Sequence, residues 1–143
     1  LTPIVCSQLN ELEDCITSLR TAGKLRCVIA AGGDGTVSSV ASRSNSDVPI
    51  AILPLGTENL LAKFLEVQPD ATKLAESVAR LNTLRLDCGE ANGKLFLVMA
   101  GVGFDAQVVQ YMSQQRTGHI THWTYYKPIT NSVWQYRFPE IAI

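Results

Sequence analysis

The stretch CVIAAGGDGTVSSVASR, residues 27–43, decides the fold, because it runs a buried strand through a glycine-rich turn into a helix. Residues 25–31, LRCVIAA, are short, apolar and partly β-branched, which is typical of a strand buried in a parallel sheet. Residues 36–42 place apolar side chains at helical spacing. GGDGT, residues 32–36, is therefore expected in the loop between a strand and a helix.

A second segment of the same kind, AILPLGTENLLAKFL, follows at residues 51–65. PIAIL, residues 49–53, predicts another buried strand, and the chain then turns at Gly56. Residues 57–59 open a helix with an apolar stripe over 60–65. Alone, this segment is explained equally well by an N-capped helix. Two such loops after consecutive strands, however, favour a shared ligand crevice.

Helices flank these two strands. Apolar side chains recur at helical spacing over residues 7–22, before Gly23, and again over 71–78, where Asp70 is placed to cap the helix. The order helix, strand, helix, strand, helix, helix is typical of a parallel sheet covered by helices. The predicted fold class of this part of the chain is α/β.

The pattern then changes to a β-rich one. Residues 84–88 alternate apolar and polar side chains, which predicts a strand, and Asn92-Gly93 predicts a two-residue hairpin turn. A hairpin does not belong to a βαβ series, so we expect an α/β domain over 1–82 and the beginning of a β-sandwich domain over 83–143. Because the chain begins with Leu and ends in FPEIAI, which predicts a strand, we expect both domains to be truncated.

Composition sets broad limits on function. With 46% hydrophobic and 17% charged residues, the 143-residue chain is ordinary for a globular protein. Its net charge of −1 gives no long-range attraction to nucleic acid. No apolar run approaches the about 20 residues of a membrane-spanning helix, and no signal peptide is visible. The four cysteines form no CxxC pair, and Cys15 and Cys27 lie in apolar segments, which predicts buried thiols in a reducing compartment.

The glycines of GGDGT point to an anion. They remove side chains and permit positive φ, so that backbone N–H groups can face a phosphate at the start of the helix. Thr36 can cap that helix or offer its hydroxyl to the phosphate. Asp34 would repel an anion unless it holds a metal or takes a proton, which favours chemistry. The alternative is a tight turn in which Asp34 accepts from backbone amides. Neither loop matches a Walker loop or the dinucleotide fingerprint.

Three motifs together resemble a known family. GGDGT, then PLGTENLLAK about 20 residues later, then GVGFDA at residues 101–106, resemble the diacylglycerol kinase catalytic domain family, which includes bacterial lipid kinases and sphingosine kinases. The resemblance runs from about residue 24 to 143. It implies a nucleotide-binding α/β domain followed by a β-sandwich, with the active site between them. It also implies ATP as the donor, Mg²⁺ as the helper and a lipid hydroxyl as the acceptor.

The resemblance also assigns residues. The nucleotide-binding residues that it implies are Gly32, Gly33, Asp34, Gly35, Thr36, Val37, Ser38, Gly56, Thr57 and Asn59. Asp34 is the implied catalytic residue, the family's base is expected downstream of Ile143, and the metal ligands are unknown. The chain has Ser38-Ser39 where the family usually has Asn-Glu, and Leu60 where it often has Asp.

Several weaker candidates have two readings each. Asp87 is either a solvated strand residue or a cleft residue, and Asp105 is either a helix N-cap or a substrate-side residue. His119 and His122 have no third ligand near in sequence, which favours ordinary histidines over a metal site. Four aromatic residues favour core packing, with the mouth of a lipid site as the alternative. They are Trp123, Tyr125, Tyr126 and Trp134.

The functional hypothesis is an ATP-dependent kinase that phosphorylates a diacylglycerol-like lipid. We expect it in the cytoplasm, acting on its lipid as a peripheral protein at a membrane surface, without nucleic acid. The alternatives are a kinase on a soluble acceptor, as in the related NAD kinases, and a nucleotide-binding module without catalysis. The oligomeric state cannot be inferred.

Overall fold

The computed structural model describes residues 2–44 and 46–114. It divides the chain into two compact units, the first ending at Val98 and the second beginning at Met99. The two histidines and four aromatic residues considered above, and the strand predicted at the end of the chain, lie outside the described residues.

The first unit contains the predicted α/β arrangement. Its elements up to residue 80 are α1 (Leu9–Thr21), β1 (Val28–Gly32), α2 (Asp34–Arg43), β2 (Ile50–Pro54), α3 (Leu60–Phe64) and α4 (Ala71–Arg80). β1 and β2 pair in parallel, from Val28 opposite Ile50 to Gly32 opposite Pro54. The α/β fold class is thus confirmed for this unit, and both glycine loops leave the sheet at the same edge.

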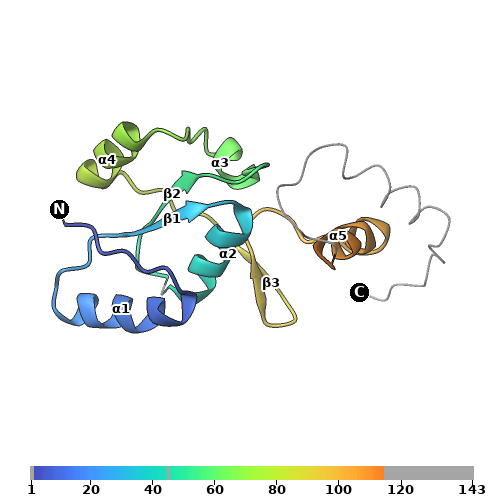
Figure 1. Ribbon diagram of the computed structural model, residues 1–143, viewed down its shortest axis with the longest axis horizontal. Helices are drawn as coiled ribbons and strands as arrows, with labels where there is room; N and C mark the ends of the chain where they lie inside the picture. The colour runs from blue at the N-terminus through green and yellow to red at the C-terminus, as the bar shows by residue number, and fades with distance from the viewer. Residues whose placement is uncertain (1, 45, 115–143) are drawn as a thin grey trace. The chain divides into compact units, whose positions relative to one another are not determined.

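Helices cover both faces of the β1–β2 pair. In Figure 1, α1 and α2 lie on one side of the strands, and α3 and α4 lie on the other. The core contains small and β-branched side chains from the strands, of which Ala30 is 1% exposed. The buried core residues are Leu12, Ile16, Ala30, Val37, Val40, Val48, Ile52, Leu61 and Ala62. Helical spacing therefore located the inward faces of α1 and α2, whereas Leu60 and Phe64 of the stripe predicted for α3 are exposed.

Polar contacts fix α4, which has no buried residue of its own. The Asp70 carboxylate accepts from the N–H groups of Thr72 and Lys73 at 2.8 and 3.1 Å, which confirms the predicted cap. At the other end, the Arg26 guanidinium donates to the carbonyl oxygens of Val78 and Ala79. These contacts satisfy groups that every helix terminus leaves without intrahelical partners.

The hairpin forms, but the strand before it does not. β3 (Gly89–Ala91) and β4 (Lys94–Phe96) are antiparallel, and the turn residues Asn92 and Gly93 both have positive φ, at 51° and 72°. The predicted turn is thus confirmed. The predicted strand over 84–88 is wrong, because that segment has no regular structure and pairs with no strand among the described residues.

The hairpin belongs to the first unit, where β4 contacts α2. The second unit contains α5 (Phe104–Gln114). Asp105 lies in the first turn of α5 rather than at its cap, and Gly103 before it has a φ of 87°. The division into domains at residue 82 and the β-sandwich both stay predictions.

The cysteines are less buried than predicted. Cys15 and Cys27 are half-buried, and all four cysteines are free. Burial raises the pKa of the Cys27 thiol, with a smaller opposing effect from the nearby Arg26 charge. Cys27 is therefore protonated at neutral pH and suited to packing rather than to nucleophilic chemistry.

Candidate functional site

The two glycine loops touch through their backbones. The first loop is residues 32–36 and the second loop is residues 55–59. The N–H of Leu55 donates to the carbonyl of Gly32 at 3.0 Å, which extends the β1–β2 ladder by one bond. A Cβ placed on Gly56 would lie 2.5 Å from the Cα of Gly33, closer than any real side chain allows. Glycine is therefore required at position 56, because the backbones of the two loops are in contact there.

Positive φ is not what the first loop needs from its glycines. Gly32, Gly33 and Gly35 are absent from the residues with positive φ, so that expectation was wrong. A Cβ on Gly32 would meet the Thr36 hydroxyl oxygen at 2.3 Å, whereas a Cβ on Gly35 would have no neighbour within 4 Å. The first loop is thus crowded on its inner side and open at Gly35, in the first turn of α2.

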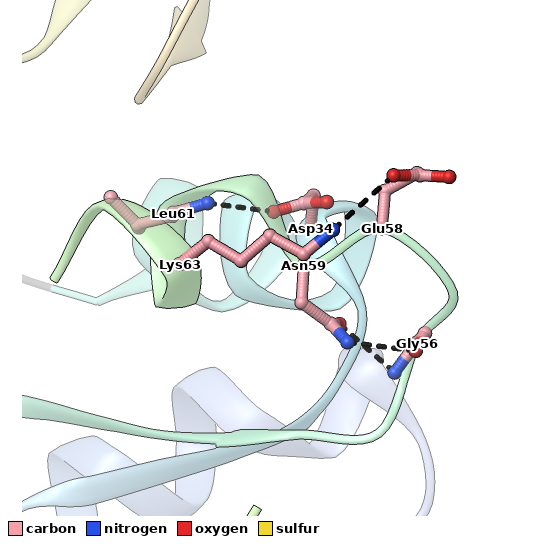
Figure 2. Close-up of polar contacts among 6 residues, drawn as sticks. All are labelled: Asp34, Gly56, Glu58, Asn59, Leu61 and Lys63. Carbon is pink, nitrogen blue, oxygen red and sulfur yellow. Dashed lines mark hydrogen bonds and ion pairs between the residues drawn. The ribbon is translucent and has the colours of Figure 1, made fainter. Parts of the chain in front are cut away.

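The left-handed residue lies in the second loop instead. Asn59 has a φ of 50°, a conformation that Asn tolerates better than most side chains. Its side chain accepts from the N–H of Gly56 at 3.0 Å and donates to the carbonyl of Gly56 at 2.7 Å (Figure 2). Asn59 therefore closes the second loop on itself.

Asp34 joins the first loop to α3, the helix that follows the second loop. Its Oδ1 accepts from the N–H of Leu61 at 3.1 Å, and the carboxylate is half-buried (Figure 2). α3 has no cap from its own N-cap residue, Asn59, so this distant carboxylate serves as its cap. One of the two readings of Asp34, acceptance from a backbone amide, is thus present in the structure. It uses one carboxylate oxygen, and the other accepts from no group in residues 2–44 and 46–114.

The start of α2 carries unused donors. The N–H groups of Thr36 and Val37 both donate to the Gly33 carbonyl, at 2.9 and 3.1 Å. Within the described residues, the N–H groups of Gly33, Asp34 and Gly35 donate to no acceptor. No side chain caps α2, so capping by Thr36 was wrong, and the Thr36 side chain is exposed. Three adjacent donors at a helix N-terminus can bind an anion.

The other predicted site residues are distributed around these donors. Thr57 is exposed in the second loop, while Ser38 and Ser39 are half-buried in α2. Val37 is only 4% exposed because its side chain belongs to the core. Its N–H is already bonded to Gly33. Asp87 lies in the irregular segment before β3 and is exposed.

Two further charges stand at the second loop. Glu58 Oε2 and Lys63 Nζ are 3.4 Å apart, with 39% and 63% of their side chains exposed. Nothing in the sequence signals this pair beyond the presence of the two residues. The described part of the chain holds no group of three His, Cys, Asp or Glu placed to bind a metal.

Comparison with known proteins identifies the family. The profile of the diacylglycerol kinase catalytic domain matches residues 3–91, more than half of the chain. A probable lipid kinase, YegS-like, of Pseudomonas aeruginosa is 41% identical over 93 residues, covering 61% of this chain and 30% of that protein. Its Pseudomonas fluorescens counterpart is 38% identical over 110 residues, covering 75% and 36%.

An uncharacterised Synechocystis protein, sll0036, is 37% identical over 84 residues, covering 58% of this chain and 19% of that protein. The chain thus spans between about a fifth and about a third of the length of these relatives. No solved structure matches it. By the match over residues 3–91, the chain belongs to the diacylglycerol kinase catalytic domain family.

Proposed function

We propose that this protein is an ATP-dependent lipid kinase, which transfers the γ-phosphoryl group to the hydroxyl of a diacylglycerol-like lipid. The observation that carries the proposal is the open first turn of α2. There, three free N–H groups lie beside Asp34, a half-buried carboxylate with one oxygen unused. Family membership and the names of the Pseudomonas relatives, probable lipid kinases, support the same function.

The residues present fit a nucleotide phosphate. The N–H groups of Gly33, Asp34 and Gly35 supply donors, and the N-terminal end of α2 supplies a favourable dipole. Because nothing lies within 4 Å of a Cβ built on Gly35, a phosphate oxygen can approach the backbone there. The exposed hydroxyls of Thr36 and Thr57 add donors that can rotate toward the nucleotide.

The site also fits Mg²⁺ bound together with the nucleotide. Mg²⁺ is commonly held by one or two carboxylates plus phosphate oxygens and water, and the unused oxygen of Asp34 suits that role. When bound, the ion neutralises charge on the phosphoryl group during transfer. Asp34 itself caps the start of α3 through the N–H of Leu61. The base that accepts the lipid hydroxyl proton is expected outside residues 1–143, as the family resemblance implies.

A lipid acceptor is consistent with the surface near the second loop. Leu55, the first residue of this loop, and Phe64, the last residue of α3, are 63% and 72% exposed. Of the helices that the structure describes, none has the length and apolar character to cross a bilayer. We propose that the protein acts in the cytoplasm and meets its lipid at a membrane surface as a peripheral protein.

A transfer assay tests the proposal. The full-length protein is incubated with γ-labelled ATP, Mg²⁺ and vesicles that contain diacylglycerol or another lipid with a free hydroxyl, and the products are extracted into organic solvent. We expect label in the lipid phase, dependent on both the lipid and Mg²⁺. Label on a water-soluble acceptor would support a kinase of the NAD kinase type instead. Nucleotide binding without any transfer of label would indicate that the protein is a nucleotide-binding module without catalysis.

A further inference from the structure

Lys63 is a cation beside the two loops to which the proposed function gives no role. It belongs to α3 and pairs with Glu58 of the second loop across 3.4 Å (Figure 2). Throughout residues 2–44 and 46–114, no other Lys or Arg side chain makes an ion pair or hydrogen bond to either loop. Among the described Lys and Arg side chains, Lys63 is therefore the one that makes an ion pair with a residue of these loops.

The ammonium group of Lys63 is directed toward the start of α3. Helical side chains lean toward the N-terminus, and the contact with Glu58, which precedes the helix, shows that Lys63 does so. The Asp34 carboxylate reaches the same end of α3 through the N–H of Leu61. A positive and a negative group thus flank this helix start, beside the contact between Gly33 and Gly56.

The electrostatics of the first loop favour a cation from the protein in addition to the proposed Mg²⁺. Its free N–H groups provide partial charges only, and Asp34 adds a negative charge close to them. The triphosphate of ATP carries several negative charges, which are stabilised best by fully charged donors. An exposed ion pair such as Glu58–Lys63 is weak, so a phosphate can displace Glu58 readily.

We propose, on the basis of the proposed function, that Lys63 binds the β- or γ-phosphate of ATP. Its ion pair with Glu58 breaks when the nucleotide binds. In the nucleotide-free protein, Glu58 keeps the ammonium group at the second loop. On binding, the flexible four-carbon stem moves the charge to the phosphate without movement of the backbone. Glu58 then competes with the nucleotide for Lys63.

Nucleotide affinities of variants of the full-length protein test this role. Calorimetry with AMP, ADP and ATP is performed on wild type, Lys63→Met, Lys63→Arg and Glu58→Gln. Lys73→Met is the control, because Lys73 of α4 also reaches the residue five positions before it, donating to the neutral amide oxygen of Gln68 at 2.7 Å. Lys63 is 63% exposed, so its replacement is not expected to unfold the protein, and thermal unfolding checks this.

The expected pattern has two signs. Lys63→Met should weaken ATP binding about 10- to 100-fold and leave AMP binding unchanged. Lys63→Arg keeps the positive charge and should retain most of the wild-type affinity for ATP. Glu58→Gln should strengthen ATP binding about two- to five-fold, because the competing partner has gone. Lys73→Met should behave as wild type.

Other outcomes overturn the inference. Equal ATP affinity in wild type and Lys63→Met would remove Lys63 from the site while leaving the kinase proposal intact. Equal losses of affinity for AMP and ATP in Lys63→Met would also contradict a contact with the β- or γ-phosphate, which AMP lacks. Unchanged or weaker ATP binding in Glu58→Gln would show that Glu58 does not hold Lys63 in reserve. A wild-type protein that binds no ATP would refute the proposed function, and the role of Lys63 with it.

Discussion

The first and second loops follow the same strand–loop–helix pattern but are built differently. In the second loop, Gly56 donates to Asn59 and Leu55 donates to Gly32, whereas the N–H groups of residues 57–59 have no acceptor among the described residues. In the first loop, three successive N–H groups have no acceptor among the described residues. Both loops therefore have free donors, but those of the first loop lie at the start of a ten-residue helix, beside the half-buried Asp34 carboxylate.

The hydrogen bond between Asp34 and Leu61 ties the first loop to the helix that follows the second loop. Asp34→Asn retains an oxygen that can accept from the Leu61 N–H, whereas Asp34→Ala does not. We expect both variants to lose phosphoryl transfer by about 150-fold, which corresponds to about 3 kcal/mol of transition-state stabilisation. Only Asp34→Ala should also lose stability, by about 1 kcal/mol, as for a deleted helix cap.

Initial rates and urea unfolding of the full-length protein measure the two effects separately. More than half of wild-type activity in Asp34→Asn would show that the carboxylate has no chemical role. Equal stability of the two variants would show that the contact with Leu61 does not support α3.

The contact between the loops should be sensitive to a single methyl group. Gly56→Ala places a Cβ 2.5 Å from the Gly33 Cα and 2.8 Å from the Asn59 Oδ1, so the loops must separate. We expect a loss of about 1–3 kcal/mol in unfolding free energy, typical of overpacking, together with weaker ATP binding. Urea unfolding and calorimetry measure these changes, and wild-type values for both would contradict a tight crossing.

Gly35→Ala should have the smallest structural effect and separate binding from folding. The position is helical and open, so Ala should keep or raise stability, by about 0.5 kcal/mol. The added methyl group nevertheless projects where we place the phosphate, and ATP affinity should fall. Lower stability would reveal a contact that the structure does not contain. Unchanged affinity would exclude close approach of a phosphate at Gly35.

The sequence was sufficient for the features that depend on local chemistry. Helical spacing identified the inward faces of α1 and α2, Asp70 was recognised as a cap, and Asn92-Gly93 was recognised as a hairpin turn. The strand over 84–88 was predicted wrongly because alternation describes side chains only. A strand also needs a neighbour to bond with, and none of the described strands pairs with this segment.

The support of the site could not be predicted because it depends on distant residues. Asp34 and Leu61 are 27 positions apart, and nothing in either local sequence signals their hydrogen bond. The glycines of the first loop suggested positive φ, but close packing against Thr36 and Gly56 explains Gly32 and Gly33 instead. The site residues that the family resemblance implies stay predictions, whereas the structure shows how the two loops contact each other through Gly33 and Gly56.

The most direct test of the central claim follows the backbone amides themselves. The ¹⁵N-labelled full-length protein is titrated with ATP and Mg²⁺, and the amide resonances of both loops are monitored by NMR. The account predicts large shifts for Gly33, Asp34 and Gly35, whose N–H groups gain an acceptor, and smaller shifts for Gly56 and Leu61, whose N–H groups already have one. Large shifts at Gly56 and Leu61 with none at the start of α2 would contradict it.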